Sequence, residues 1–370
     1  MILARPSHLT IRRARSRAVL LSPSPRFLAI TRSALIATMA SPESRPTAAM
    51  PPMIYGTAWK KERTADLVYE AIKAGFRGID TAAMTKHYDE AGAGQGIRRA
   101  IREGIVTRRE LYIQTKFTPL DPSSPYDPSD PIAAQIHASL ASSLANLAED
   151  GRQDEAYLDA YLLHSPFPRG SQTLEAWSAL QSYLPASSDP ARRGRVLRLG
   201  ISNAPLDVLE SLHPAPSVVQ NPLYGGPGPR GRWDRAVRAW CRRGSSSSSS
   251  GGGGGDSQQA DASASEGEVK YQGFWTLTAN AAVWSPPRGE WFVVEVANGA
   301  GVSRPGAWYA LLMEKGVVVL NGTTSPERMR EDLEVKEKVE RWKETKEGRD
   351  AWERCWKGLE EFLEQRRGSQ

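Results

Sequence analysis

Short apolar runs alternate with amphipathic stretches from residue 51 almost to the end of the chain. Residues 317–320 read Val-Val-Val-Leu, and such a continuous run is typical of a parallel strand that is buried on both faces. Residues 61–74 show the other pattern, because Leu67, Val68 and Ile72 recur at helical spacing and Gly75 then ends the predicted helix. The chain therefore alternates between predicted strands and predicted helices.

Eight segments of each kind follow one another. The predicted strands are residues 53–57, 76–80, 111–116, 156–163, 196–201, 217–220, 269–275 and 317–320. The predicted helices are residues 61–74, 90–103, 131–149, 174–184, 205–212, 233–242, 305–315 and those from 326 onward. This alternation predicts an α/β protein with a single (β/α)8 TIM barrel at residues 51–340. A doubly wound sheet alternates in the same way, and the number of strands is what favours the barrel.

Two segments depart from the alternation. Residues 244–268 contain six consecutive serines and then five glycines, a composition that predicts a disordered, low-complexity insert. It falls between the sixth helix and the seventh strand, which in a barrel is the face opposite the functional loops. Residues 341–370 predict a charged C-terminal helix with an apolar stripe that includes Trp352 and Phe362. We expect this helix to pack on the outside of the barrel, and a partner-binding helix is the alternative.

The positive charge of the chain lies at its beginning. The formal net charge is +6, but residues 1–50 hold eight arginines and one acid, so they carry +7 and the rest of the chain carries −1. A basic, Ser-rich segment with almost no acids is typical of a mitochondrial transit peptide. The alternative is a start at Met39, which would give a cytosolic protein. Under either interpretation we expect residues 1–50 to be a disordered leader, and the near-neutral body argues against nucleic-acid binding.

Cysteine usage and hydropathy exclude further classes. Cys241 and Cys355 lie far apart and belong to no Cys-x-x-Cys motif, so the sequence predicts neither a disulfide framework nor a metal site. No run of about 18 apolar residues is present, so no membrane span is expected.

Polar side chains stand at or near the carboxyl ends of the second, third and fourth predicted strands. Asp80 ends the second strand, and Tyr88 follows eight residues later. Lys116 ends the third strand and His164 ends the fourth. The functional side chains of a parallel barrel lie at these strand ends, and burying such groups is costly unless they are paired. We therefore expect the four residues to form one catalytic site.

These residue types suit the reduction of a carbonyl group. Tyrosine is a weak acid with an ordinary pKa of about 10, and the ammonium group of Lys116 is expected to lower the pKa of Tyr88. Asp80 would hold Lys116 charged and oriented, and a neutral His164 would align the carbonyl oxygen. Tyr88 would protonate that oxygen while hydride reaches the carbon, and no metal is needed.

The motifs around these residues resemble those of the aldo-keto reductase family. Beyond the four residues, the resemblance rests on five segments: 53–59 (MIYGTAW), 199–203 (LGISN), 219–221 (VQN), 271–277 (YQGFWTL) and 319–328 (VLNGTTSPER). The motifs occur in order at barrel-like spacing and cover about residues 51–340 except for the Ser/Gly-rich insert. The segments around Tyr88 and at 271–277 look most like those of fungal and related divergent members.

The resemblance implies an NADPH-dependent reductase that converts an aldehyde or ketone into an alcohol, and NADH is not excluded as its cofactor. It implies these cofactor-binding residues: Gly56, Thr57, Ser202, Asn203, Gln220, Phe274, Thr323 and Arg328. Ser202, Asn203 and Gln220 match the residues that hold the nicotinamide carboxamide. Phe274 would stack on the nicotinamide ring, and Arg328 would clamp the adenosine 2′-phosphate. Trp59 would line the pocket for a small carbonyl substrate.

The sequence departs from the family pattern at three places. Three extra residues separate Asp80 from Tyr88, and Gly322 stands where many members have a phosphate-binding lysine. Asp332 stands where many have asparagine, and its charge would repel a 2′-phosphate unless the carboxylate turns away. A preference for NADPH would then rest on Arg328.

A second function is compatible with the same motifs. Some members of the family accompany ion channels as regulatory modules, and these bind NADP(H) with little turnover. The presence of all four catalytic residues favours the enzyme. The sequence indicates neither the physiological substrate nor the oligomeric state.

Overall fold

The protein is described from a computed structural model, which describes residues 48–226, 232–244 and 268–364. Residues 1–47 of the predicted leader and residues 245–267 of the predicted insert lie outside the described residues.

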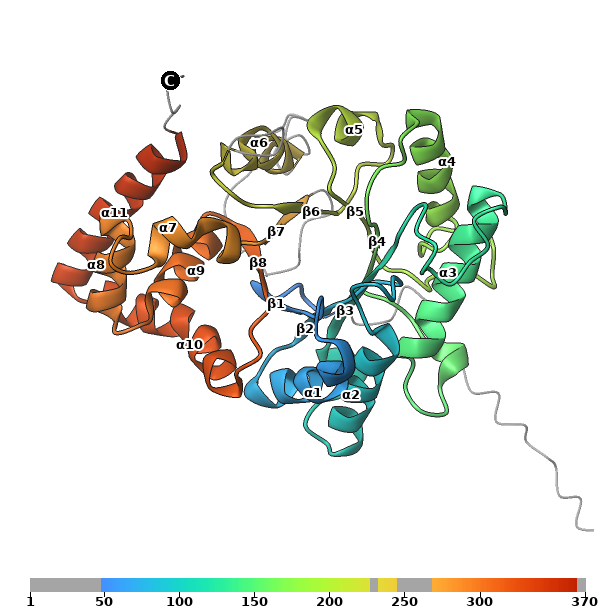
Figure 1. Cartoon of the computed structure of the whole chain (residues 1–370), viewed down its shortest axis with the longest axis horizontal. Helices are drawn as coiled ribbons and strands as arrows, with labels where there is room; N and C mark the ends of the chain where they lie inside the picture. The colour runs from blue at the N-terminus through green and yellow to red at the C-terminus, as the bar shows by residue number, and fades with distance from the viewer. Residues whose placement is uncertain (1–47, 227–231, 245–267, 365–370) are drawn as a thin grey trace, which may run out of the picture. The chain divides into compact units, whose positions relative to one another are not determined.

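Parallel strands close into a barrel in the order β1 to β8, and Figure 1 shows them around the centre with the helices outside. The strands are β1 (Met53–Gly56), β2 (Gly78–Asp80), β3 (Tyr112–Phe117), β4 (Ala160–Leu163), β5 (Leu199–Ser202), β6 (Val218–Pro222), β7 (Lys270–Phe274) and β8 (Val317–Asn321). The barrel closes because β8 pairs with β1, with Met53 opposite Val319. The predicted (β/α)8 fold is confirmed.

The helices that surround the barrel are α1 (Thr64–Ala74), α2 (Glu90–Arg102), α3 (Ile132–Leu147), α4 (Gly170–Gln181), α5 (Leu206–Ser211), α6 (Arg235–Gly244), α7 (Ala281–Trp284), α8 (Trp291–Ala300), α9 (Arg304–Glu314), α10 (Pro326–Lys343) and α11 (Lys346–Glu364). Helix α1 shows how the sequence pattern works: Leu67, Val68, Ala71 and Ile72 are buried on one face. Gly75 ends the helix with a φ of 121°, a backbone conformation that favours glycine.

Helices α7 and α8 were not predicted. They lie between β7 and α9, and α8 is buried through Phe292, Val293, Val296 and Ala297, which recur at helical spacing. Gly301 ends α8 in the left-handed conformation, at a φ of 64°. The signals for this helix were therefore present, but they stood in a connection that the (β/α)8 pattern does not require.

The single helix expected from residue 326 onward is two helices. α10 ends at Lys343, and α11 begins after Thr345, whose hydroxyl accepts a hydrogen bond from the backbone N–H of Gly348 at 3.0 Å. The expected apolar stripe is present, since Trp352 and Leu359 are buried. It packs mainly against α8 and α10. Figure 1 shows α8 and α11 next to each other at the side of the barrel.

A second apolar cluster includes residues at the amino ends of β3 and β6. Tyr112, Leu162 and Val218 belong to it, and Ala48 and Met50 pack against it. The two cysteines are buried and unpaired with each other. No helix in the described part of the chain is long and apolar enough to cross a membrane.

Candidate active site

The predicted site residues meet in a cavity of about 950 Å³ at the carboxyl ends of the strands. Those that line it are Gly56, Trp59, Asp80, Tyr88, His164, Ser202, Asn203, Gln220, Phe274, Thr323 and Arg328. Thr57 and Lys116 do not line the cavity and are fully buried behind it. The hydroxyl of Thr57 donates to the backbone oxygen of Asp80 at 3.0 Å.

Asp80 and Lys116 form a buried ion pair beneath the cavity. The Lys116 ammonium group donates to both carboxylate oxygens of Asp80 at 2.7 Å and to the backbone oxygen of Thr81 at 2.8 Å. All three ammonium hydrogens are thus engaged. Burial lowers the pKa of Lys116, and the contacts with Asp80 oppose that shift.

Tyr88 lies between this ion pair and the cavity. Lys116 Nζ is 5.2 Å from the centre of the Tyr88 ring. Among the described residues, none donates to or accepts from the Tyr88 hydroxyl, and the residue lines the cavity. The expectation that Lys116 lowers the pKa of Tyr88 is wrong: burial raises that pKa, and the negative charge of Asp80 raises it further. The hydroxyl is therefore protonated at neutral pH.

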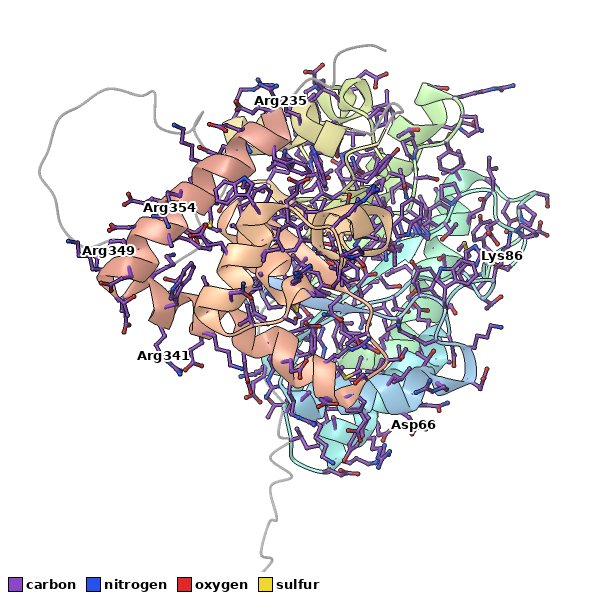
Figure 2. All side chains as sticks on the ribbon, turned by 60° about the vertical axis from the view of Figure 1, so that its left-hand side comes forward. Asp66, Lys86, Arg235, Arg341, Arg349 and Arg354 are labelled. Atoms are coloured by element: carbon purple, nitrogen blue, oxygen red, sulfur yellow. The ribbon has the colours of Figure 1, made fainter. Side chains whose placement is uncertain are left out.

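The longer loop between Asp80 and Tyr88 is fastened to the loop that follows β3. Ser124 Oγ donates to the backbone oxygen of Ala83 at 3.0 Å, and Thr85 Oγ1 donates to that of Ser123 at 3.1 Å. Lys86, at the tip, is exposed, and Figure 2 shows it on the opposite side of the barrel from Arg341, Arg349 and Arg354 of α10 and α11. The three extra residues thus form a surface turn and still place Tyr88 in the cavity.

His164 is held as a neutral ring. Its Nδ1 is 2.7 Å from the hydroxyl of Thr118, so the other nitrogen, Nε2, is left for the cavity that the residue lines. Burial first and the charge of Lys116 second lower the pKa of His164 to about 3. The ring centres of Tyr88 and His164 are 6.0 Å apart.

The residues expected to hold the nicotinamide carboxamide are joined by hydrogen bonds. Ser202 Oγ donates to the backbone oxygen of Gln220 at 2.8 Å, and Asn203 Nδ2 donates to that of His164 at 3.0 Å. Asn203 has a φ of 56°, in the left-handed region that asparagine tolerates better than most residues. Gln220 Nε2 donates to Asp80 Oδ1 at 3.0 Å and to Gln272 Oε1 at 2.9 Å.

Basic groups gather where β8 meets α10. Lys60 is buried, and its ammonium group donates to the backbone oxygen of Gly322. Within the described part of the chain it has no carboxylate partner, and burial followed by the charge of Arg63 lowers its pKa. Arg328 lies in the first turn of α10 and lines the same cavity with Thr323. Lys60 therefore places a cation at the position where the sequence lacks a lysine.

The carboxylate of Asp332, whose charge would repel a 2′-phosphate, is buried and partly turned away from the cavity. Its Oδ2 accepts a hydrogen bond from Asn321 Nδ2 at 2.7 Å. Burial raises the pKa of Asp332 to about 6, although the bond from Asn321 opposes this shift.

Aromatic side chains form the mouth of the cavity. Phe274 ends β7, and its ring centre is 5.2 Å from that of Trp275 in an edge-to-face arrangement. Trp59 and Trp275 are 64% and 58% exposed, and both have a positive φ, of 63° and 58°. Such a backbone is strained for a bulky residue, and strain of this kind gathers at binding sites. The ring of His87 lies 3.9 Å from that of Trp59.

Comparison with known proteins agrees with this geometry. Residues 52–224 match the family model described as "Aldo/keto reductase family". Residues 52–224 belong to the aldo-keto reductase family. Over 144 residues it is 36% identical to "Aldo-keto reductase AKR2E4" of Bombyx mori, an alignment that covers 37% of this chain and 39% of that protein. Over 316 residues it is 26% identical to "Probable NAD(P)H-dependent D-xylose reductase xyl1" of the fungus Emericella nidulans, covering 77% of this chain and 85% of that protein.

Solved structures of aldo-keto reductases show the same fold. The structure titled "Crystal structure of Bombyx mori aldo-keto reductase (AKR2E4) in complex with NADP" superimposes with a TM-score of 0.57 at 20% identity, covering 84% of this chain and 89% of that one. At this identity the likeness shows the fold alone. The chain spans about half or less of several curated relatives that it matches, for example 39% of the Bombyx mori protein and 55% of a xylose reductase of Candida tenuis.

Sequence reasoning missed four polar residues of this aldo-keto reductase site, namely Lys60, Thr118, Gln114 and Gln272. A local signal exists for Thr118 and Gln114, because they stand two residues either side of Lys116 and alternate residues of a strand share a face. None exists for Lys60, whose partner Gly322 lies 262 residues away. Among the described residues, no three His, Cys, Asp or Glu side chains gather as metal ligands would.

Proposed function

We propose that this aldo-keto reductase uses NADPH to reduce an aldehyde or ketone to an alcohol, with Tyr88 as the proton donor. One observation carries the proposal: Tyr88 and His164 line one cavity, and Lys116 lies 5.2 Å below the Tyr88 ring in an ion pair with Asp80. The names of relatives support it, since those from yeasts include NAD(P)H-dependent D-xylose reductases.

The side chains present suit proton transfer to a carbonyl oxygen. The Tyr88 hydroxyl is protonated at neutral pH and has no described protein partner, so it is available as a donor. His164 is neutral and holds the same oxygen through Nε2, because Thr118 occupies Nδ1. Lys116 Nζ lies 5.2 Å from the centre of the Tyr88 ring, so its charge offsets part of the cost that burial and Asp80 place on the negative charge that Tyr88 acquires as the proton leaves.

The cavity fits a nicotinamide dinucleotide. Such a cofactor supplies hydride when it is bound. Phe274 offers an aromatic face for a planar ring, and Lys60 and Arg328 offer cations for phosphate groups. Lys60 is the sharpest sign of an anionic ligand, because a buried ammonium group without a carboxylate partner is costly.

The direct test is the consumption of NADPH with a nitrobenzaldehyde as substrate. Turnover that depends on both compounds is expected. Binding of NADPH without any turnover, across a panel of aldehydes and ketones, would refute the enzyme and support a regulatory module.

Cofactor preference is tested at Arg328. Arg328→Ala should weaken NADPH binding by about tenfold, since a charge-assisted bond to the 2′-phosphate is lost, and should leave NADH binding nearly unchanged. Arg330→Ala is the matched control, because Arg330 is exposed on the same helix and does not line the cavity. Equal weakening of both cofactors by Arg328→Ala would mean that the 2′-phosphate is held elsewhere.

A further inference from the structure

Three glutamines form a continuous layer across the barrel beneath the cavity. Gln114 on β3 and Gln272 on β7 are fully buried, and Gln220 on β6 is 3% exposed. Gln114 Nε2 donates to Asp80 Oδ1 at 2.7 Å and to Gln272 Oε1 at 2.8 Å. Gln272 Nε2 donates back to Gln114 Oε1 at 2.8 Å. Gln272 Nε2 also donates to the sulfur of Met50 at 3.5 Å.

The charge of Asp80 sets the direction of every hydrogen bond in this layer. An ion-paired carboxylate only accepts, so Gln114 and Gln220 must both turn their nitrogens toward Asp80 Oδ1. Their remaining N–H groups both meet Gln272, which must therefore present its oxygen. The nitrogen of Gln272 then faces the oxygen of Gln114. Reversing any one amide in the layer would place two hydrogen-bond donors, or two acceptors, against each other.

In this arrangement one polar group of the layer, the side-chain oxygen of Gln220, is available to a ligand in the cavity. Both N–H groups of Gln220 are engaged, with Asp80 and with Gln272. No described residue donates to Gln220 Oε1, and that oxygen is not sealed away from solvent. Since Gln220 lines the cavity, it offers an acceptor there and no donor.

We infer that Gln272 is a positioning residue, which together with Asp80 makes Gln220 present its oxygen to the cofactor cavity. The site should therefore select a ligand that offers an N–H group at this point, as the carboxamide of nicotinamide does. The same layer joins Asp80, which orients Lys116, to the end of the cavity that would hold this carboxamide. The inference rests on the proposed function.

The first test needs no substitution and compares three nucleotides on the full chain: NADP⁺, its thionicotinamide analogue and its 3-acetylpyridine analogue. The thio analogue keeps the NH₂ group, and the acetyl analogue has a methyl group in its place. We expect the thio analogue to bind within about threefold of NADP⁺. The acetyl analogue should bind at least about tenfold more weakly, because Gln220 Oε1 would lose its donor. Equal affinity for NADP⁺ and the acetyl analogue would overturn the inference.

The second test removes Gln272. In Gln272→Met one N–H group of Gln220 loses its acceptor, so only the bond to Asp80 Oδ1 still holds the amide and it can rotate toward the cavity more easily. The preference for NADP⁺ over the acetyl analogue should fall to about threefold or less, while the affinity for adenosine 2′,5′-bisphosphate stays the same. An unchanged preference in a folded Gln272→Met protein would show that the layer is only structural.

Two glutamine variants serve as matched controls. Gln114→Met also removes an amide from the layer but leaves both acceptors of Gln220 in place, so the preference should stay near that of the natural chain. Gln135→Met removes a buried glutamine of α3, which donates to the backbone of Pro128 and Asp130 outside the site. A loss of preference in Gln135→Met equal to that in Gln272→Met would also overturn the inference. Failure of all three nucleotides to bind would refute the proposed function together with the inference.

Discussion

At the scale of single residues, burial decides the protonation of the site. It raises the pKa of Tyr88, lowers that of His164 to about 3 and raises that of Asp332 to about 6. A tyrosine that keeps its proton is a hydrogen-bond donor, and a neutral histidine holds a carbonyl oxygen without competing as an acid. Tyr88 and His164, which both line the cavity, thus suit separate roles in the proposed reaction because both are desolvated.

Tyr88→Phe tests the role of the hydroxyl. It removes one oxygen and keeps the ring above Lys116, so turnover should fall by about 10²–10⁴-fold while NADPH affinity stays nearly constant. Steady-state kinetics and a binding titration measure the two effects. Tyr161→Phe is the control, since the buried hydroxyl of Tyr161 bonds to Ser139 away from the cavity. Equal losses of turnover and of NADPH affinity in Tyr88→Phe would contradict the assignment.

Asp332→Asn tests the raised pKa of that carboxyl. The pKa is about 6 in the folded protein and 3.8 in the unfolded chain, so the folded state binds more protons between these values. This contribution to stability is complete below about pH 4 and is lost as the pH rises through 6. Above that pH the ionised carboxylate costs up to about 3 kcal/mol. Asparagine removes the cost and keeps an acceptor for Asn321.

The expected result is a melting temperature that rises by a few degrees at pH 7.5 in Asp332→Asn and does not rise at pH 3.5, below the ordinary pKa of 3.8. Thermal unfolding at the two pH values measures it. Asp350→Asn, on the exposed face of α11, should shift neither value. A rise of the same size at both pH values would mean that ionisation of Asp332 is not the cause.

At the scale of elements, the helices after β7 are packed through glycines. A Cβ on Gly299 of α8 would lie 2.5 Å from the ring of Trp342 at the end of α10. A Cβ on Gly358 of α11 would lie 2.5 Å from the ring of Trp291. Trp342 and Trp291 thus pack directly against helix backbone at positions where glycine has no side chain. The C-terminal helices cover the barrel side by this close contact.

Gly299→Ala should therefore destabilise the protein by about 1–3 kcal/mol, because the added methyl group overlaps the Trp342 ring. Urea unfolding measures the change in midpoint. Gly170→Ala at the start of α4 is the control, since its Cβ would meet nothing within 4 Å and stability should change by less than about 0.5 kcal/mol. Turnover at a temperature where both proteins are folded should not change, and a loss of turnover would show that this packing reaches the cavity.

At the scale of the whole molecule, the cavity lies at the carboxyl ends of the strands, and the connections that enter the strands lie at the opposite face of the barrel. Residues at or just after the carboxyl ends of the strands line the cavity, except for β3, whose Lys116 is buried behind it. The helical connections return the chain to the amino end of the next strand. The connection from α6 to β7, which contains residues 245–267, leads to the amino end of β7 at Lys270. Phe274, which lines the cavity, is at the other end of that strand.

Replacing residues 245–267 with a short flexible linker should leave kcat/KM within about twofold, because the altered connection is at the amino end of β7. Kinetics with NADPH and an aldehyde measure this. NADPH should also raise the melting temperature of both proteins, as a ligand of the native state does. A large loss of kcat/KM with a normal melting temperature would show that the segment acts on the cavity.

The arrangement of strands and the main site residues could be predicted because their signals are local. Apolar runs such as 317–320 mark buried strands wherever they occur. Asp80, Lys116 and His164 stand at strand ends, and a parallel barrel brings all such ends to one face. Helix α8 had local signals too, but it lies in a connection that the alternation does not require.

The sequence by itself thus determined the barrel, the face that carries the site and most of the side chains there. Only the tertiary structure decided which of them touch. Lys60 reaches Gly322 across 262 residues, and Gln114 meets Gln272 across 158. It also reversed the expected pKa shift of Tyr88, because desolvation depends on everything packed around a group, and burial and the charge of Asp80 both raise that pKa. Spacing along the chain records neither distance across the barrel nor burial, and these two quantities set the chemistry of the site.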